Sequence, residues 1–178
     1  MKYLLVSDIH GDYKEVEFIS KKFNELKCKK IICLGDFLYH GPRNALPKNY
    51  DPKKCVELLN QYKDKIIAIK GNCDAEVDEM VLNFKFHKKL SLNLFHHHFV
   101  LLHGHHLDKL KNLKKGDIVL YGHYHIFDIH QENAITYINP GSISIPRNNL
   151  AKTYGLIDEN GIFIYDKENK LVLSYKFS

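Results

Sequence analysis

The segment Val6-Ser7-Asp8-Ile9-His10-Gly11 follows the first apolar run of the chain, and the rest of the sequence is interpreted from it. The apolar run is typical of a buried strand, and Gly11 marks the turn that ends it. Asp8 and His10 alternate with Ile9, so an extended backbone would point both side chains to one side. Such an oxygen and nitrogen pair can occupy two positions on one metal ion. The alternative is that Asp8 caps the following helix and His10 is an ordinary loop residue.

The length and composition are those of one globular domain. The chain has 178 residues, of which 44% are hydrophobic and 26% charged, within the usual range for such domains. No apolar run approaches the roughly 20 residues that cross a bilayer, and the N-terminal apolar run is too short for a signal peptide. We therefore expect a single domain over residues 1–178, a cytoplasmic location and no membrane association.

Cysteine usage and charge narrow the class of protein further. The formal net charge of +5 is modest and biases the surface toward anionic substrates. No basic run is interleaved with aromatic residues, so we expect no dedicated nucleic-acid surface. The four cysteines lack disulfide or C-x-x-C spacing and are expected to be free thiols; they are Cys28, Cys33, Cys55 and Cys73.

The first part of the chain alternates between predicted strands and helices. Apolar residues recur at three- and four-residue steps from about Tyr13 to Lys27, which predicts an amphipathic helix. A second helix is predicted from the N-cap Asp51 to about Tyr62. Buried strands are predicted at 30–34 and 65–70. This alternation indicates parallel strands with right-handed crossovers.

From residue 84 onward the pattern changes to strands and hairpins. The triplet His96-His97-His98 lies between two of these strands and is expected to form an exposed turn. The change of texture, without a linker, predicts an α/β domain of two packed sheets. The strands predicted in this part cover residues 90–94, 99–102, 117–121, 126–131, 134–139, 154–157, 162–165 and 171–177.

Five short motifs rich in Asp, Asn and His lie at the ends of predicted strands, and strand ends of α/β sheets converge on one rim. Asp8, Asp36, Asn72 and up to five His of these motifs can act as donors, which is too many for one ion and suits two ions bridged by a carboxylate. Mixed oxygen and imidazole ligands favour Mn, Fe, Co, Ni or Zn. The motifs are Asp8-Ile9-His10, Gly35-Asp36, Gly71-Asn72-Cys73-Asp74, His103-Gly104-His105 and Gly122-His123-Tyr124-His125.

The order D-x-H, G-D, G-N-x-D, H-G-H, G-H-x-H resembles the calcineurin-like metallophosphoesterase superfamily, whose fold is an αββα sandwich of two packed mixed β-sheets flanked by helices. The segments 40–47, 71–74 and 139–142 are similar, more specifically, to YfcE-type bacterial phosphodiesterases. The resemblance runs from the first strand to about Pro146, and the C-terminal hairpins also suit this family. It further implies a homo-oligomer.

Carried over by position, the resemblance implies two divalent metal ions, with manganese expected first and zinc, iron, nickel or cobalt as alternatives. The implied ligands are Asp8, His10 and His125 for the first ion, Asn72, His103 and His123 for the second, and Asp36 as the bridge between them.

The mechanism predicted from such a site is direct hydrolysis. Two ions about 3.5–4 Å apart lower the pKa of a bridging water and neutralise phosphate oxygens. Hydroxide can then attack phosphorus in line with the leaving oxygen, which gives a phosphomonoester and an alcohol. No phosphorylated side chain is needed.

The sequence departs from the protein phosphatases of the superfamily at three positions. Tyr39 and His40 stand where those enzymes have Asp and Arg, and Cys73 stands where they have the His that protonates the leaving oxygen. Protein phosphatase activity is therefore disfavoured, and substrates with acidic leaving groups should react best. His105 or a metal-bound water is the candidate acid. We interpret Cys73 as a packing or pocket-wall thiol and not as a nucleophile.

Residues near the ligands complete the candidate site. Asp74 either orients a ligand from behind or caps the next helix. Arg43 can contact phosphate through two nitrogens, although it can equally be an exposed loop residue. The turn 139–142 is expected to support the His123/His125 loop. The predicted catalytic set comprises Asp36, Asn72, His105 and Asp74, and the predicted substrate contacts are His40, Arg43, Asn44 and Cys73.

The sequence therefore predicts a metal-dependent phosphoric diester hydrolase that acts on a small-molecule phosphodiester. One alternative is a phosphomonoesterase that uses the same site. The other is a catalytically inert metal-binding scaffold for protein partners, like the retromer subunit of this fold.

Overall fold

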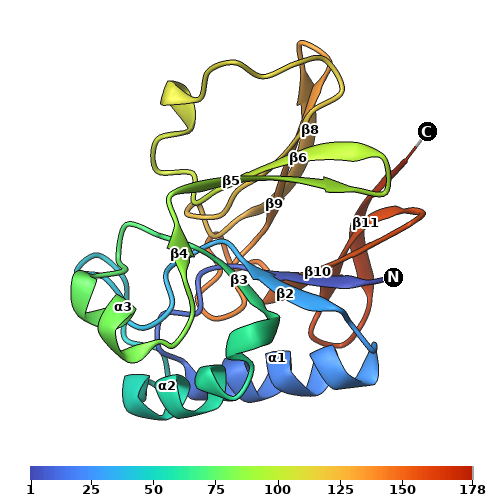
Figure 1. Ribbon diagram of the computed structural model, residues 1–178. Helices are drawn as coiled ribbons and strands as arrows, with labels where there is room; N and C mark the ends of the chain where they lie inside the picture. The colour runs from blue at the N-terminus through green and yellow to red at the C-terminus, as the bar shows by residue number, and fades with distance from the viewer. Residues whose placement is uncertain (178) are drawn as a thin grey trace.

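Two β-sheets lie face to face in the computed structural model, which describes residues 1–177 (Figure 1). The first sheet has the strand order β12-β11-β10-β1-β2-β3-β4, and the second has the order β5-β6-β7-β9-β8. Both sheets contain parallel and antiparallel pairs. The predicted fold class, α/β with two packed mixed β-sheets, is confirmed.

The strands of the first sheet are β1 (Tyr3–Val6), β2 (Lys30–Cys33), β3 (Ile66–Ile69), β4 (Phe86–His87), β10 (Thr153–Asp158), β11 (Gly161–Asp166) and β12 (Leu171–Lys176). Those of the second sheet are β5 (Lys89–Leu94), β6 (His97–Leu102), β7 (Ile118–Leu120), β8 (Phe127–Glu132) and β9 (Ile135–Pro140). The helices are α1 (Tyr13–Glu25), α2 (Pro52–Asn60) and α3 (Glu76–Val81), with two 3₁₀ turns, η1 (Lys63–Lys65) and η2 (Leu107–Lys109).

The first sheet is built from both ends of the chain. Strands β1, β2 and β3 are parallel, as the strand–helix alternation predicts. Strand β10 then pairs antiparallel with β1, with Tyr3 opposite Ile157, and the meander β10-β11-β12 extends the sheet on that side. The two sheets therefore do not correspond to two halves of the sequence. Pairing with β10 covers the edge of β1, a strand whose four residues are all buried.

The main core lies between the two sheets. Leu5, Ile32 and Ile157 from the first sheet and Phe99 and Leu120 from the second belong to one cluster of side chains that are fully buried. Strand β1 also buries its opposite face, against the helices, because successive side chains point to alternate faces. A strand buried on both faces reads as a continuous apolar run, which is the pattern at the start of the sequence.

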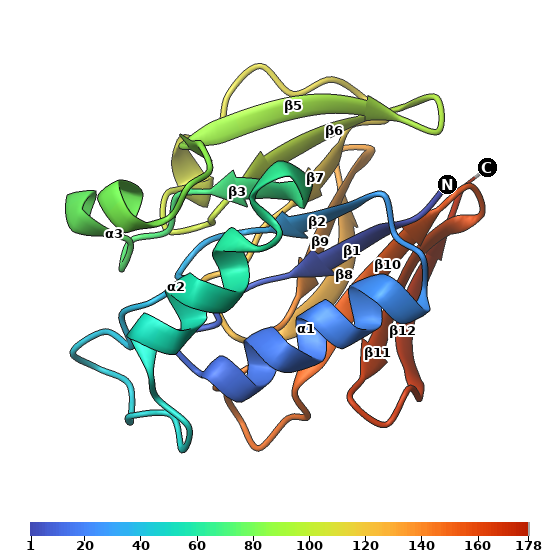
Figure 2. The ribbon, with the colours of Figure 1, turned by 60° about the horizontal axis from the view of Figure 1, so that its bottom comes forward.

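Helices α1 and α2 cover the outer face of the first sheet (Figure 2). Asp12 caps α1 by accepting a hydrogen bond from the backbone N–H of Lys14 at 3.2 Å. The alternative in which Asp8 caps this helix is therefore wrong. Asp51 caps α2, as predicted. Among residues 1–177, no helix is both long and apolar enough to cross a membrane.

The outer face of the second sheet is covered differently. Leu107, Leu110 and Leu113, from the η2 turn and the loop after it, pack against Val119 and Tyr121. Apolar side chains of a loop thus take the place of a second α-helical layer.

The histidine triplet is only partly a turn. The turn lies at Phe95 and His96, which both have positive φ. His97 and His98 belong to β6 and pair with Leu94 and Asn93 of β5. The prediction of an exposed turn over all three histidines is therefore wrong, because the hairpin closes two residues earlier than the apolar pattern indicates.

Removing the Phe99 ring should destabilise the packing between the sheets. Phe99→Ala is expected to lower the free energy of unfolding by about 3–5 kcal/mol, because it leaves a cavity in a fully buried cluster. Urea unfolding followed by circular dichroism measures this. Leu171→Ala, at a position 49% exposed in β12, is the control and should change stability by less than about 0.5 kcal/mol. An equally small effect for Phe99→Ala would contradict the assigned core.

Candidate metal centre

Five predicted motifs come together at one edge of the sandwich. They follow β1, β2 and β3 of the first sheet and β6 and β7 of the second, and these strands are parallel within each sheet. Parallel strands end at the same edge, so their loops become neighbours. Both sheets therefore contribute side chains to one centre, in which Asp8, His10, Asp36, His103 and His125 are buried.

Hydrogen bonds continue between these loops beyond the strands. The backbone N–H of Asp8 donates to the Gly35 carbonyl at 3.1 Å, and that of His10 donates to the Asp36 carbonyl at 2.9 Å. In the second sheet, the N–H of Gly122 donates to the carbonyl of His103 at 2.7 Å. Backbone hydrogen bonds alone therefore hold these loops to one another.

The backbone at the predicted ligands is left-handed and not extended. Asp8 has a φ of 58° and His10 a φ of 49°, which corrects the expectation that an extended segment points both side chains to one side. Positive φ also occurs at Asp36, His123 and His125. Each such residue costs roughly 1 kcal/mol or more, and conformations of this kind cluster at functional sites.

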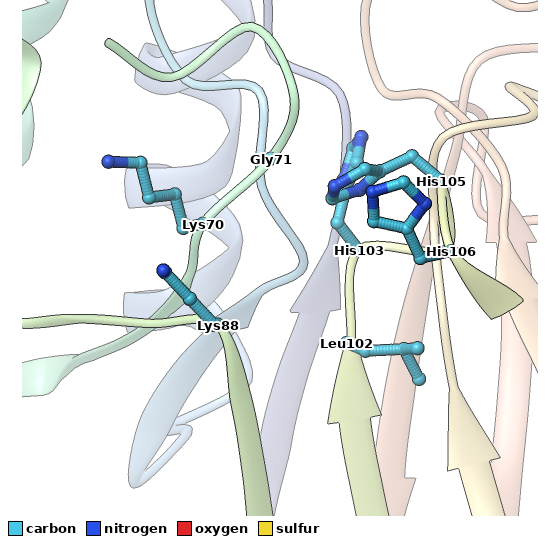
Figure 3. A pocket seen from close by; sticks show the side chains of 7 residues that line it. All are labelled: Lys70, Gly71, Lys88, Leu102, His103, His105 and His106. Atoms are coloured by element: carbon cyan, nitrogen blue, oxygen red, sulfur yellow. The ribbon is translucent and has the colours of Figure 1, made fainter. Parts of the chain in front are cut away.

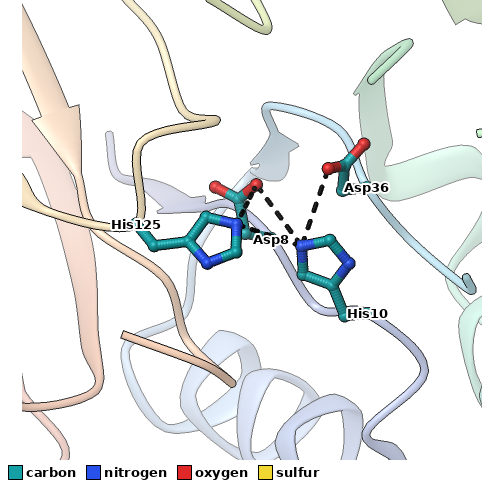
Figure 4. Close-up of side chains that lie close together, drawn as sticks. All are labelled: Asp8, His10, Asp36 and His125. Carbon is teal, nitrogen blue, oxygen red and sulfur yellow. Dashed lines mark hydrogen bonds and ion pairs between the residues drawn. The ribbon is translucent and has the colours of Figure 1, made fainter. Parts of the chain in front are cut away.

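Asp8, His10, Asp36 and His125 form a compact buried cluster (Figure 4). One donor atom from each lies within 4.8 Å of the others, an arrangement that can hold a metal ion. The Nε2 atoms of His10 and His125 are 3.1 Å apart. The Nε2 atom of His125 is 3.3 Å from Oδ1 of Asp8.

The ring orientations suit a bound cation. The Nδ1 atom of His10 lies 2.8 Å from the carbonyl of Tyr39, and that of His125 lies 2.8 Å from the carbonyl of Ile145. A carbonyl only accepts, so both Nδ1 atoms carry hydrogen and the Nε2 lone pairs face each other. Oδ1 of Asp8 is buried without a hydrogen-bond partner. A divalent ion satisfies these donor atoms together, and the residues fit one.

A second group of donors adjoins the first through Asp36. Nε2 of His103 lies 3.3 Å from Oδ2 of Asp36 and 3.1 Å from Oδ1 of Asn72. The same Oδ2 atom lies 3.6 Å from Nε2 of His10. The ring of His123 lies beside that of His103, with centroids 5.2 Å apart. One carboxylate oxygen is therefore shared by two groups of donors.

The electrostatics of the centre favour positive charge. Burial alone would raise the pKa of Asp8, but its imidazole neighbours hold that pKa well below its usual range. Burial opposes protonation of His103, yet Asp36 and Asp8 raise its pKa to about 9. Burial, together with the charge of His103, lowers the pKa of His123 to about 4 and leaves that ring neutral with a free lone pair.

Comparison with known proteins identifies the family of the chain. Residues 1–161 match the family model of the calcineurin-like phosphoesterase superfamily domain. Phosphodiesterase YfcE of Escherichia coli is 36% identical over 177 residues, which cover 98% of this chain and 96% of that protein. A probable metallophosphoesterase of Mycoplasma genitalium is 39% identical over 161 residues, covering 83% of this chain and 80% of that protein.

The chain belongs to the calcineurin-like phosphoesterase superfamily. The structure of the Escherichia coli phosphoesterase YfcE is similar to that of this chain, with a TM-score of 0.96, 36% identity and complete coverage of both chains. The predicted family and the predicted class of enzyme, a phosphoesterase, are confirmed. Membership and the cluster around Asp36 imply divalent metal ions.

Asp74 holds the backbone of this phosphoesterase around Asp36. Its carboxylate accepts hydrogen bonds from the backbone N–H groups of Asp36, Phe37 and Gly71 at 2.9, 2.7 and 2.7 Å. Helix α3 has Ala75 as its N-cap residue, so Asp74 does not cap it. Burial and the charge of Asp36 raise the pKa of Asp74 to about 6, against the three N–H donors, which favour its ionised form. Of the two roles predicted for Asp74, these contacts fit the positioning of the proposed ligand Asp36 and not the capping of a helix.

Cys73 supports Asp36 with its backbone. Its N–H donates to Oδ1 of Asp36 at 2.9 Å, which leaves Oδ2 to face the imidazoles. Burial and the charge of Asp36 raise the pKa of the Cys73 thiol to about 12. Such a thiol stays protonated near neutral pH, as the interpretation of Cys73 as a wall residue requires.

The turn at residues 139–142 supports the loops, as predicted. The Asn139 amide donates to the Gly122 carbonyl at 2.8 Å, and the Ser142 hydroxyl donates to the Asp8 carbonyl at 2.8 Å. Glycine is required at 122, because a Cβ there would lie 1.9 Å from Oγ of Ser7. These contacts join a loop of the second sheet to a loop of the first.

A small hollow of about 30 Å³ opens onto the donors. Of the predicted substrate contacts, Arg43, Asn44 and Cys73 line it, whereas His40 does not and instead packs its ring against Tyr50. Arg147 also lines it, and the sequence analysis missed this residue. The only feature of the sequence that singles out Arg147 is that arginine occurs at just two positions in the chain.

A larger pocket of about 350 Å³ lies on the His103 side of the centre (Figure 3). Lys70 and Lys88 stand on one side of it, and His103, His105 and His106 on the other. The ring centroid of His105 is 5.5 Å from that of His103. The candidate acid thus lies next to the donors without being one of this buried set.

Replacing Asp74 should loosen the backbone that carries Asp36. Asp74→Ala is expected to lower the free energy of unfolding by about 3 kcal/mol, because it leaves three backbone N–H groups without their acceptor. Urea unfolding, together with the metal content of the purified variant, measures this. Asp74→Asn, which keeps one accepting oxygen, should lose less. Unchanged stability and metal content in Asp74→Ala would refute the positioning role.

Proposed function

We propose that the chain is a dinuclear metal-dependent phosphodiesterase that hydrolyses a small phosphodiester. The observation that carries this proposal is the position of Asp36. Its Oδ2 atom lies 3.6 Å from Nε2 of His10 and 3.3 Å from Nε2 of His103, so it is in reach of both groups of donors. A carboxylate oxygen shared in this way suits a bridge between two ions.

The proposed ligands are divided between two ions as the family resemblance implies. When bound, two divalent ions supply Lewis acidity toward the phosphate and activate water near neutral pH. We propose manganese as the ion, because oxygen and imidazole donors are mixed and no thiolate takes part; zinc, iron, nickel and cobalt suit the same donors. The proposed set is Asp8, His10 and His125 for one ion, Asn72, His103 and His123 for the other, and Asp36 for both.

The chain's own residues orient the donors and exclude competing chemistry. Backbone carbonyls fix the His10, His103 and His125 rings so that Nε2 points into the centre. The protonated Cys73 thiol neither attacks phosphorus nor displaces a ligand. With Cys73 where the protein phosphatases have a proton-donating His, the site suits leaving groups that depart as stable anions.

Two features support a diester over a monoester. The small hollow at the donors shares Arg43, Asn44 and Arg147 with a hollow of about 560 Å³, and His103 lines a further pocket of about 350 Å³, so the surroundings of the centre offer space for two ester substituents. The similar Escherichia coli protein is named a phosphodiesterase. An inert scaffold is less well supported, because a scaffold has no need for strained backbone at Asp8, His10 and Asp36.

With manganese bound, the protein should cleave bis-p-nitrophenyl phosphate much faster than p-nitrophenyl phosphate. Asp36→Asn should lower the rate more than about a hundredfold, because removal of even a supporting group of a metal site costs 10–100-fold. Release of p-nitrophenolate measures both substrates, and treatment with a chelator should abolish turnover.

Metal analysis of the same preparations separates the alternatives. Two ions per chain in the parent protein, reduced in Asp36→Asn, would accompany phosphodiesterase activity. A faster reaction with the monoester would replace the diesterase with a phosphomonoesterase. Bound metal without turnover of either ester would favour the scaffold.

His105 is proposed to protonate leaving groups that are poor anions. His105→Ala should lower the rate for an alkyl p-nitrophenyl diester little, but that for a dialkyl or alkyl phenyl diester by about a hundredfold, because acid catalysis matters only for poor leaving groups. His106→Ala is the matched control, since His106 lines the same pocket. Equal losses with both classes of leaving group would remove His105 from this role.

A further inference from the structure

Both arginines of the chain lie beside the metal centre. The sequence has 26 lysines and arginines together, and arginine occupies only positions 43 and 147. Arg43 comes from the loop after β2, and Arg147 from the segment between β9 and β10. Two segments far apart in the sequence therefore bring the only guanidinium groups to the hollow that contains Asp36 and His125.

A groove of about 560 Å³ continues outward from this hollow. Arg43, Asn44 and Arg147 line both, so the groove and the hollow are continuous. Ile145 and Pro146 form part of its wall. A substituent of a phosphate held at the donors would extend along this groove and pass both guanidinium groups.

Each arginine is tied to a proposed ligand by the backbone. The N–H of Arg147 donates to the carbonyl of His125 at 3.1 Å, and the ring of His125 donates to the carbonyl of Ile145 at 2.8 Å. On the other side, His10 donates to the carbonyl of Tyr39 in the loop that carries Arg43. Arg147 is thus held directly beside a proposed ligand, and Arg43 lies in a loop that another proposed ligand contacts.

Neither guanidinium has a partner among the residues that the structure describes. Across residues 1–177, no ion pair or side-chain hydrogen bond involves Arg43 or Arg147, although several lysines, Lys152 and Lys167 among them, pair with acidic side chains. A guanidinium presents a planar fork of donors that matches a carboxylate or phosphate through two nitrogens, which an ammonium group cannot do.

We propose that Arg43 and Arg147 bind a second anionic group of the substrate, a carboxylate or a further phosphate, next to the phosphodiester that is cleaved. The substrate is then a diester with a negatively charged substituent. This inference rests on the proposed function and adds the chemical class of one substituent. Because both side chains are exposed to solvent, the gain is on the order of tenfold and declines with added salt.

Two esters that differ only in charge test this inference. They are 2-carboxyethyl p-nitrophenyl phosphate and its amide, 2-carbamoylethyl p-nitrophenyl phosphate, which share the leaving group and nearly the same shape. The manganese-loaded protein should show a kcat/KM on the order of tenfold higher for the carboxylate. The preference should disappear in R43Q/R147Q and be reduced in R43K/R147K, because lysine keeps the charge but loses the fork.

Lys115→Gln provides a control for net charge. Lys115 is exposed and precedes β7, at the opposite end of that strand from His123. Its loss should leave both the preference and the rate with the amide unchanged. Absence of a preference in the parent protein, or its persistence in R43Q/R147Q, would overturn the inference.

A binding measurement separates this inference from the proposed function. Calorimetry of the manganese-loaded protein with 3-phosphonopropionate and with propylphosphonate measures binding without turnover, because neither compound can be hydrolysed. It reports whether Arg43 and Arg147 act as a clamp on the carboxylate. Tighter binding of the carboxylate, lost in R43Q/R147Q, would support the clamp even if no diester were cleaved. Equal binding of the two phosphonates would overturn the clamp and leave the phosphodiesterase standing.

Discussion

The carboxylate of Asp36 is the point on which the rest of the structure depends. One oxygen is fixed by the backbone N–H of Cys73, and the other faces imidazoles on two sides. Burying this carboxylate close to that of Asp8 is costly unless positive charge lies between them. Asp74 then supports it from behind, through three hydrogen bonds to the backbone. The surrounding loops hold acceptor atoms toward one point, and a bound cation would offset the cost of burying them together.

Such a centre requires a rigid support, which explains why both sheets contribute. Asp8 and Asp36 follow strands of the first sheet, and His103 and His125 follow strands of the second. Left-handed backbone at three of these four residues would relax if the strands below could shift. The fully buried cluster between the sheets prevents such a shift. Contacts such as that from Ser142 to the Asp8 carbonyl join the two sheets at the rim itself.

The sequence predicts which loops meet at the centre, because the ends of buried strands are visible in the apolar pattern. An apolar run that stops at Asp8 or Asp36 marks both a strand and the loop after it. It predicts the pairing less well, because the meander β10-β11-β12 has the same alternation in either sheet, and only the free edge of β1 decides where it joins. The left-handed backbone at Asp8 and His10 depends on hydrogen bonds from the neighbouring loop, which no local pattern encodes. Arg147 was missed because only the fold brings it to the hollow that Arg43 also lines.

A centre built from carboxylates and imidazoles recognises a phosphate and little else. Choice among phosphate esters must therefore come from the loops around it, and the loops here are not chemically neutral. Elsewhere the chain uses lysine for positive charge, and lysine suffices wherever only net charge matters. Arginine differs from lysine in geometry, because it binds a planar anion through two nitrogens at once. Arginine occurs at only two positions, and both line the groove that leads away from the metal centre. Binding of a planar anion through two nitrogens at this groove would explain that restriction. On the proposals made above, the metal centre would determine the reaction and this groove would select the substrate.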